Sequence, residues 1–227
     1  MRSFSLLALL ILLASCGSDQ PTTETVETDR TLTSEGIDSL EAVQAENQRK
    51  DNTPPGDTIS FEAAFSRFMT ALQAGDTVSL NQYIHPEYGL WLIEQPGAVP
   101  AFSHFRRIQE VKRNYQNRPF SSINTEVRNC DLQQRNNFPE FDCAWMDQGK
   151  SGYAEDGCFY STSPSFINSD MWKYASLSEQ QQQLVQRAQK QVQITVLHTR
   201  SSYQFHFNHD GERWRLLFAD LRIPCSA

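Results

Sequence analysis

A histidine and a carboxylate that stand close together are the first residues in this sequence that could do acid–base chemistry. His85 and Glu87 lie on either side of Pro86, in a segment that ends at Gly89. If their side chains converged, they could transfer protons as a general acid and a general base. The other interpretation is a turn that ends a helix, with His85 capping a carbonyl group and Glu87 solvated. We favour the turn, because two residues at this spacing are a weak motif.

Two further candidates lie near the end of the sequence. His206 alternates with aromatic residues and shares a strand face with Gln204 and Asn208. That face is either the solvent side of a sheet or the polar lining of a cone-shaped cavity. Asp220 stands beside Arg222, and its carboxylate either enters a pocket or forms a surface ion pair.

Metal and cofactor chemistry have weaker support in the sequence. His104 together with His85 could hold a metal ion, but their spacing is not diagnostic of a metal site. His209 flanks a turn and is expected to be solvated. No Gly-x-Ser-x-Gly, phosphate-loop, Gly-x-Gly-x-x-Gly or His-Glu-x-x-His pattern occurs, so these signatures of common hydrolases, nucleotide-binding proteins and zinc proteases are missing. We expect no cofactor and no metal.

The N-terminal residues have the features of an export signal. Arg2 supplies a positive charge, residues 6–13 form an apolar run, and Ala14 and Ser15 lead into Cys16. The run is too short to cross a bilayer, which takes about 20 apolar residues. The pattern resembles the lipobox of bacterial lipoproteins, which implies that Cys16 is lipidated and begins the mature chain. The alternative is an ordinary secretory signal with a chance cysteine.

This resemblance implies a location and a membrane contact. A lipidated Cys16 would hold the protein on a membrane of a Gram-negative cell envelope. Gly17, rather than Asp, follows the cysteine, which by analogy with lipoprotein sorting favours the outer membrane over the inner one. Nucleic acid is not an expected partner, because residues 58–227 are nearly neutral and show no basic stripe.

The other four cysteines are Cys130, Cys143, Cys158 and Cys225. An even number in an exported protein predicts two disulfides, and a zinc site is the alternative, although no pair has the spacing of a zinc knuckle. Four cysteines allow three pairings. A predicted hairpin of residues 141–145 and 156–160 would place Cys143 opposite Cys158. We therefore predict the pairs Cys143–Cys158 and Cys130–Cys225.

The composition divides the sequence into three regions. Residues 1–15 are the expected signal peptide, and residues 16–57 the lipidated cysteine with a disordered acidic tether. The tether holds ten acidic and three basic residues and few apolar ones, so it cannot bury enough surface to fold. Residues 58–227 are the expected globular domain.

Within this domain, hydrophobic periodicity predicts an α+β order. One helix is expected from Phe61 to Gly75, and a second, shorter one between Gly75 and His85. Two more are expected over about 103–115 and over 177–191, the last with a Ser178–Gln181 capping box. A loop is expected at 162–176. Tyr203, Phe205 and Phe207 mark one strand of a closing hairpin that turns at Asp210-Gly211. The other strands are expected at 90–94, 99–102, 121–129, 141–145, 153–161 and 192–199.

Two of these segments resemble a known superfamily. The Phe61-rich helix breaks at Ala74-Gly75-Asp76, and the chain closes with Tyr203-Gln-Phe-His-Phe, Asp210-Gly211 and Trp214-Arg-Leu-Leu. Both resemble the nuclear-transport-factor-2-like (cystatin-like) superfamily, particularly its lipoprotein members of unknown function. The resemblance implies a cone of about three N-terminal helices on a strongly curved antiparallel sheet. Residues 131–176 would be an inserted hairpin and loop region, and any site would lie in the cone mouth.

Two functions remain open, because this superfamily includes isomerases, dehydratases, ligand binders and adaptors. We expect a non-catalytic envelope lipoprotein whose cone binds a small molecule, a peptide or a partner protein. The alternative is an isomerase- or hydrolase-type enzyme that uses a His/carboxylate pair in the cone pocket. Two titratable groups within hydrogen-bonding reach in a pocket would favour the enzyme, and a pocket without such a pair would favour the binder.

Overall fold

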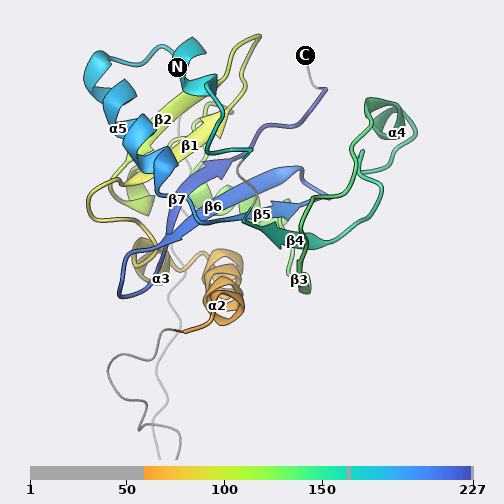
Figure 1. Cartoon of the computed structure of the whole chain (residues 1–227), viewed down its shortest axis with the longest axis horizontal. Helices are drawn as coiled ribbons and strands as arrows, with labels where there is room; N and C mark the ends of the chain where they lie inside the picture. The colour runs from red at the N-terminus through yellow and green to blue at the C-terminus, as the bar shows by residue number, and fades with distance from the viewer. Residues whose placement is uncertain (1–58, 163–164, 226–227) are drawn as a thin grey trace, which may run out of the picture. The chain divides into compact units, whose positions relative to one another are not determined.

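A seven-stranded open sheet forms the centre of the fold, in the order β2-β1-β7-β6-β5-β4-β3 (Figure 1). The computed structural model describes residues 59–162 and 165–225. The predicted signal peptide and tether, including Cys16, lie outside them. The strands are β1 (Leu90–Glu94), β2 (Ala101–Phe105), β3 (Leu132–Gln134), β4 (Cys158–Ser161), β5 (Ile194–His198), β6 (Tyr203–His209) and β7 (Trp214–Asp220).

The sheet is mixed rather than antiparallel throughout. β1 pairs with β7, and β3 with β4, in parallel, whereas the other neighbours are antiparallel. A parallel pair needs a long crossover connection, which no local sequence signal reports. The predicted α+β class is confirmed, but the prediction that the sheet is antiparallel throughout is wrong.

Helices and 3₁₀ turns fill the connections. They are α2 (Phe61–Ala74), α3 (Thr77–Asn81), α4 (Cys143–Asp147), α5 (Glu179–Lys190), η1 (Ile108–Glu110), η2 (Phe120–Thr125) and η3 (Met171–Tyr174). No helix in the described residues has the length and apolar character needed to cross a membrane. The described N-terminal part has two α-helices, because the helix expected at 103–115 is instead the end of β2 followed by η1.

The ends of α2 follow local rules. Ser60 caps the helix by accepting a hydrogen bond from the Ala63 amide at 3.3 Å. Gly75 ends it with φ of 63°, a left-handed conformation that glycine adopts without steric cost. Asp76 then caps α3 by accepting hydrogen bonds from two backbone amides.

One core lies between α2 and the sheet. Phe61, Phe65, Phe68 and Leu72 of α2 pack on Phe205, Phe207 and Leu216 of the last hairpin, and Trp214 borders them. The rings of Phe68 and Phe207 meet edge to face at 5.5 Å, a favourable aromatic geometry. The sequence predicts one core of Phe61, Phe65, Phe68, Leu72, Phe205, Trp214, Leu216 and Phe218, and all of these except Phe218 lie in or beside this core.

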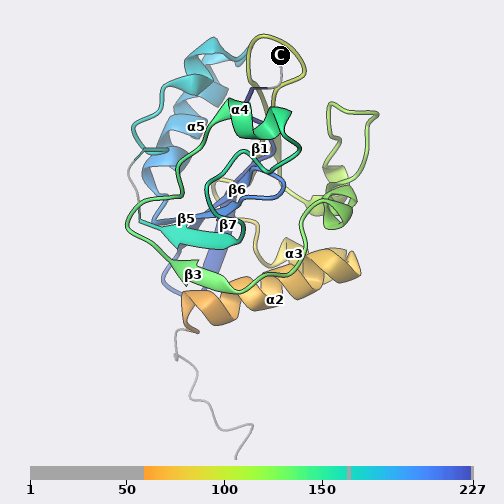
Figure 2. The ribbon, with the colours of Figure 1, turned by 90° about the vertical axis from the view of Figure 1, so that its right-hand side faces the viewer.

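A second core covers the opposite face. Val185 and Ala188 of α5 pack there against Trp91, Ile93 and Phe218, together with Phe166 and Trp172 from the 165–176 segment. Figure 2 shows α2 on one side of the sheet and α5 on the other. Phe218 was expected beside Leu216 in the first core. A register shift between His206 and Phe207 turns Leu217 and Phe218 both toward α5, which corrects that assignment.

The middle of the chain departs most from expectation. Residues 121–129, predicted as a strand, contain η2, and residues 141–145 lie largely in α4. The hairpin that would have placed Cys143 opposite Cys158 therefore does not form. α4 belongs instead to an excursion beside the β3–β4 end of the sheet (Figure 1).

The disulfide pairing is corrected as a result. The structure joins Cys130 to Cys158, with Cα atoms 5.8 Å apart, and Cys143 to Cys225, with Cα atoms 5.9 Å apart. Cys158 stands on β4 opposite Leu132 of β3, and Cys130 lies two residues before the start of that strand. The first disulfide therefore depends on a parallel strand pair that the sequence pattern did not predict.

The α2 core can be tested with Phe65→Ala. Phe65 is 3% exposed, and truncation would remove its contacts with the rings of Phe61, Phe68 and Phe207. We expect the free energy of unfolding, measured in urea, to fall by about 3–5 kcal/mol. The control is Val78→Ala, at a residue 71% exposed, which should change it by less than about 0.5 kcal/mol. A loss below about 1 kcal/mol for Phe65→Ala would contradict this packing.

Candidate functional site

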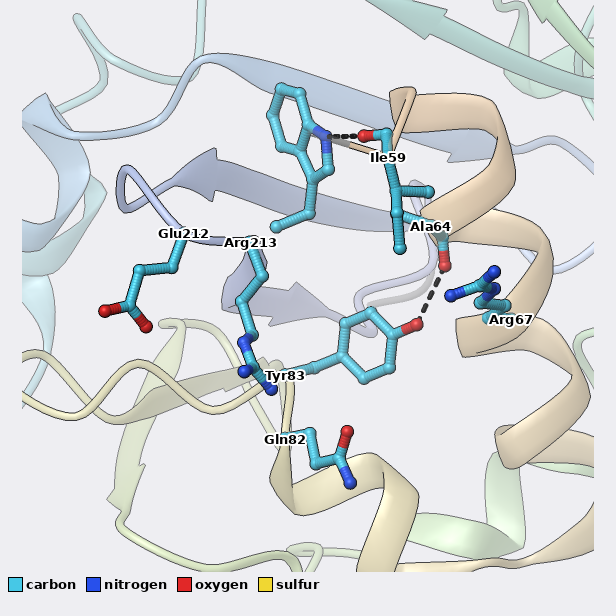
Figure 3. A pocket seen from close by; sticks show the side chains of 8 residues that line it. Ile59, Ala64, Arg67, Gln82, Tyr83, Glu212 and Arg213 are labelled. Atoms are coloured by element: carbon cyan, nitrogen blue, oxygen red, sulfur yellow. Dashed lines mark hydrogen bonds between the residues drawn. The ribbon is translucent and has the colours of Figure 1, made fainter. Parts of the chain in front are cut away.

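A pocket beside the last hairpin is the best candidate site (Figure 3). It encloses about 310 Å³ where the start of α2, the segment after α3 and the β6–β7 turn meet. We call it the Trp214 pocket. It is lined by Ile59, Ala64, Arg67, Gln82, Tyr83, Glu212, Arg213 and Trp214.

Two aromatic side chains of the pocket are fixed by hydrogen bonds to the α2 region. Tyr83 Oη donates to the carbonyl oxygen of Ala64 at 2.9 Å, and Trp214 Nε1 donates to that of Ile59 at 3.3 Å (Figure 3). The Trp214 ring also meets Phe61 edge to face at 4.9 Å. Burial raises the pKa of Tyr83, so its phenol stays protonated at neutral pH. The pocket therefore has a preorganised aromatic surface.

The β6–β7 turn presents the charged edge of the pocket. Asp210 Oδ1 accepts hydrogen bonds from the amides of Glu212 and Arg213, both at 2.9 Å, and its carboxylate pairs with Arg215. Arg215 Nη1 in turn donates to the carbonyl oxygen of Gln82 at 2.6 Å. This chain of contacts connects the turn to the end of α3, and so fixes the edge against the opposite wall.

The lining favours binding over acid–base catalysis. The lining holds two arginines, Arg67 and Arg213, and one carboxylate, that of Glu212, and no histidine, cysteine or serine is among the eight lining residues of the described chain. Trp, Tyr and Arg are the residue types that contribute most to binding energy at protein interfaces. A ligand with an apolar ring and a negative group matches this surface.

His85 is held in a turn, apart from this pocket. Its Nδ1 accepts hydrogen bonds from the amides of Glu87 and Tyr88, both at 3.1 Å, while the Glu87 side chain is exposed. The favoured turn interpretation is therefore right in kind, although the ring caps two amides and not a carbonyl. Burial lowers the pKa of His85.

His206 lies neither on a solvent face nor in a cone. It is fully buried under Phe166, whose ring stacks on the imidazole at 3.6 Å. Its Nδ1 pairs with Thr195 Oγ1 at 2.8 Å, and Nε2 has no hydrogen-bond partner in the described residues. Burial lowers the pKa of His206 to about 3, so the ring is neutral. The expectation failed because α5 and the 165–176 segment cover this face.

Asp220 forms an ion pair and does not meet His85. Arg222 donates to both of its carboxylate oxygens, from Nε at 2.8 Å and from Nη2 at 2.6 Å. Ile84, the neighbour of His85, pairs with Leu216 of β7. Leu216 is four residues before Asp220, which corresponds to about 13 Å along the strand at 3.3 Å per residue. His206 and Asp220 share the α5-facing side, but each has its own partner. The predicted candidates therefore form no common site.

The other two histidines are also occupied. His104 Nε2 pairs with the carbonyl oxygen of Tyr88 at 2.9 Å, and its ring stacks near Trp91. His209, expected in solvent, is half-buried against the Trp214 ring, and its Nδ1 accepts the amide proton of Gly211. Neither contact indicates a metal site.

A buried polar network was missed by the sequence analysis. Arg113 is 6% exposed and reaches Glu94 at 3.4 Å, Glu126 at 3.5 Å and Tyr203 Oη at 3.4 Å. Tyr203 Oη donates to Glu126, and Glu94 also accepts the Asn114 amide at 2.7 Å. These residues come from positions far apart in the chain, and no local motif connects them.

The network borders a second cavity of about 390 Å³, where Arg222 also lines the wall. Burial and the Glu126 carboxylate raise the pKa of Tyr203 to about 12, so the phenol is protonated at neutral pH. The carboxylate of Glu94 is taken up by Arg113 and Asn114. The groups of the network thus satisfy one another.

The turn that shapes the Trp214 pocket can be tested through Asp210. Amides of the turn and Arg215, acting against burial, lower the pKa of Asp210 to about 2 from 3.8. Its charge therefore stabilises the fold above about pH 4, and this contribution is lost as the pH falls through about 2. In Asp210→Asn, unfolding in urea at a series of pH values should show a deficit that shrinks between pH 4 and 2. Asp170→Asn, at an exposed ion pair, is the control. A deficit independent of pH would contradict this role.

Comparison with known proteins does not assign this chain to a family. No family model, no curated protein and no solved structure matches this chain. Its resemblance to the nuclear-transport-factor-2-like superfamily therefore stays a prediction. The function has to be inferred from the geometry of its own side chains.

Proposed function

We propose that this chain is a lipid-anchored, non-catalytic binding protein of the bacterial cell envelope, which binds its ligand in the Trp214 pocket. The observation that carries the proposal is a pocket with two fixed aromatic rings and two arginines, in which no histidine–carboxylate pair occurs among the described lining residues. The ligand is a small molecule or the end of a peptide that combines an apolar ring with a negative group.

The arrangement of charges supports a negative ligand group. Figure 3 shows Arg67 and Arg213 on opposite sides of the Tyr83 ring, and Glu212 directed away from it. Guanidinium groups are positive and present planar donors suited to a carboxylate or phosphate. A group that entered between them would meet two positive charges over an aromatic wall.

The anchoring part of the proposal rests on the N-terminal pattern that ends in Cys16. The acidic, polar composition of residues 16–57 supports the proposal that they link the anchor to the folded domain without folding themselves. We also keep the nuclear-transport-factor-2-like relation as a proposal. The α2 break at Gly75 and the closing hairpin support it, whereas the α5 layer is an addition to the expected cone.

An isomerase- or hydrolase-type enzyme is the second candidate. The observation that favours it is the network of Glu94, Arg113, Glu126 and Tyr203, which brings titratable groups within hydrogen-bonding reach beside a cavity. It ranks second because these groups already satisfy one another. The histidines predicted for such an enzyme lie outside the network's contacts.

The anchor is tested by Cys16→Ser. We expect the variant to remain unprocessed or to appear in the soluble fraction, because the residue that would carry the lipid is lost. Fractionation of cells that express either form measures this directly. Ser15→Ala, next to the same cleavage point, should leave membrane retention intact. Normal retention of the Cys16→Ser variant would contradict the lipoprotein proposal.

The pocket is tested by ligand binding to the full chain. Small molecules that co-purify with it are identified by mass spectrometry, and N-acetylphenylalanine and its uncharged amide are then titrated while chemical shifts are followed. The carboxylate should bind more tightly than the amide. Arg213→Glu should weaken it by about tenfold or more, as expected for the loss of a charged hydrogen bond.

Arg200→Glu is the matched control, because this exposed arginine lies outside the lining of the Trp214 pocket. Its affinity should equal that of the unmodified chain. Equal binding of the carboxylate and the amide, or unchanged binding in Arg213→Glu, would contradict the pocket assignment. Chemical turnover of a co-purifying molecule would favour the enzyme instead.

A further inference from the structure

The disulfide between Cys130 and Cys158 lies beside a buried histidine. A ring nitrogen of His198 and the two sulfur atoms all lie within 4.8 Å of one another. Cys158 on β4 and His198 on β5 are directly opposite in the antiparallel register, so the sheet itself fixes their closeness. This histidine is 4% exposed and was not among the predicted site residues.

The two cysteines differ in their exposure. Cys158 is completely buried, whereas Cys130 is half-buried and lines a groove of about 430 Å³ beside α2. Phe65, Met69 and Leu132 contribute apolar walls to this groove. In thiol–disulfide exchange a thiolate attacks one sulfur and the other leaves. Access therefore makes Cys130 the attacked sulfur and Cys158 the leaving one.

One ring nitrogen of His198 is held by a neighbouring serine. Its Nδ1 accepts the amide proton of Ser201 at 3.2 Å and lies 2.7 Å from Ser201 Oγ. In a neutral ring this leaves the proton on Nε2. Burial lowers the pKa of His198, and Arg200 acts in the same direction, so the ring is neutral at neutral pH. An N–H donor beside a buried thiolate offsets part of the cost of burying its charge.

We propose that Cys130–Cys158 is a thiol–disulfide exchange site that accepts two electrons from a dithiol, with His198 as hydrogen-bond donor to the leaving sulfur. A substrate thiolate attacks Cys130 Sγ, the S–S bond breaks, and Cys158 Sγ leaves with the electron pair. The second substrate thiol, losing its proton to solvent, then attacks the substrate sulfur of the mixed disulfide and releases Cys130. The substrate ends as a disulfide, and the two cysteines end as thiols after proton uptake from water.

The test uses the full chain with Cys16, Cys143 and Cys225 each replaced by serine. Cys130 and Cys158 are then the two cysteines that remain of the five. Glutathione is added under native conditions, free thiols are alkylated, and the mixed disulfide is located by peptide mass spectrometry. The adduct should be on Cys130, with Cys158 alkylated. With dithiothreitol, the rate of opening should rise in proportion to its concentration.

His198→Phe in this background should slow the opening by dithiothreitol about tenfold, because phenylalanine keeps a ring but has no N–H donor, as expected for one lost hydrogen bond to a charged acceptor. His209→Phe, at the opposite end of β6 from the residue that pairs with His198, is the matched control and should leave the rate unchanged. An adduct on Cys158, or a rate independent of dithiothreitol concentration, would overturn the proposal, because opening would then follow unfolding. These two readouts need no histidine variant and stand even if His198→Phe fails to fold.

Discussion

The structure depends on the burial of both faces of its last hairpin. β6 and β7 lie in the middle of the sheet, with α2 on one face and α5 on the other. Strands buried on both faces are usually apolar throughout, but β6 places His206 and Asn208 inside. Such groups are costly unless they are hydrogen-bonded. The Thr195–His206 pair provides one of the bonds that make this central position tolerable.

The hairpin also organises the candidate site. The turn that joins β6 to β7 is closed by Asp210 and carries Glu212 and Arg213 at its edge. Because its two strands are clamped between layers, the turn projects from a rigid base. The Trp214 pocket thus gains its shape from the core, and only its charged edge from exposed residues. A rigid base lowers the entropy lost when a ligand binds.

Local sequence signals recovered the parts of the fold that local physics determines. The closing hairpin was predictable, except for its register shift, because alternation and an Asp-Gly turn specify strands and turn together. The α5 helix was predictable from its Ser178–Gln181 capping box, which the structure contains. The parallel β3–β4 pair, the network around Arg113 and the His198–Cys158 contact were not predictable, because each joins residues far apart in the chain. The second core was missed because β6 carries His206 at a buried position, where polarity suggested solvent.

The disulfide between Cys143 and Cys225 has a mechanical consequence. It closes a covalent ring whose ends are 82 residues apart, and β4 to β7 and α5 all lie inside that ring. Tension applied between Ile59 and Cys225 would run along the chain to Cys143 and cross directly to the last cysteine. The central strands and the Trp214 wall of the pocket would then bear none of the load along their own backbone. Pulling on the molecule would extend only the portion before the ring.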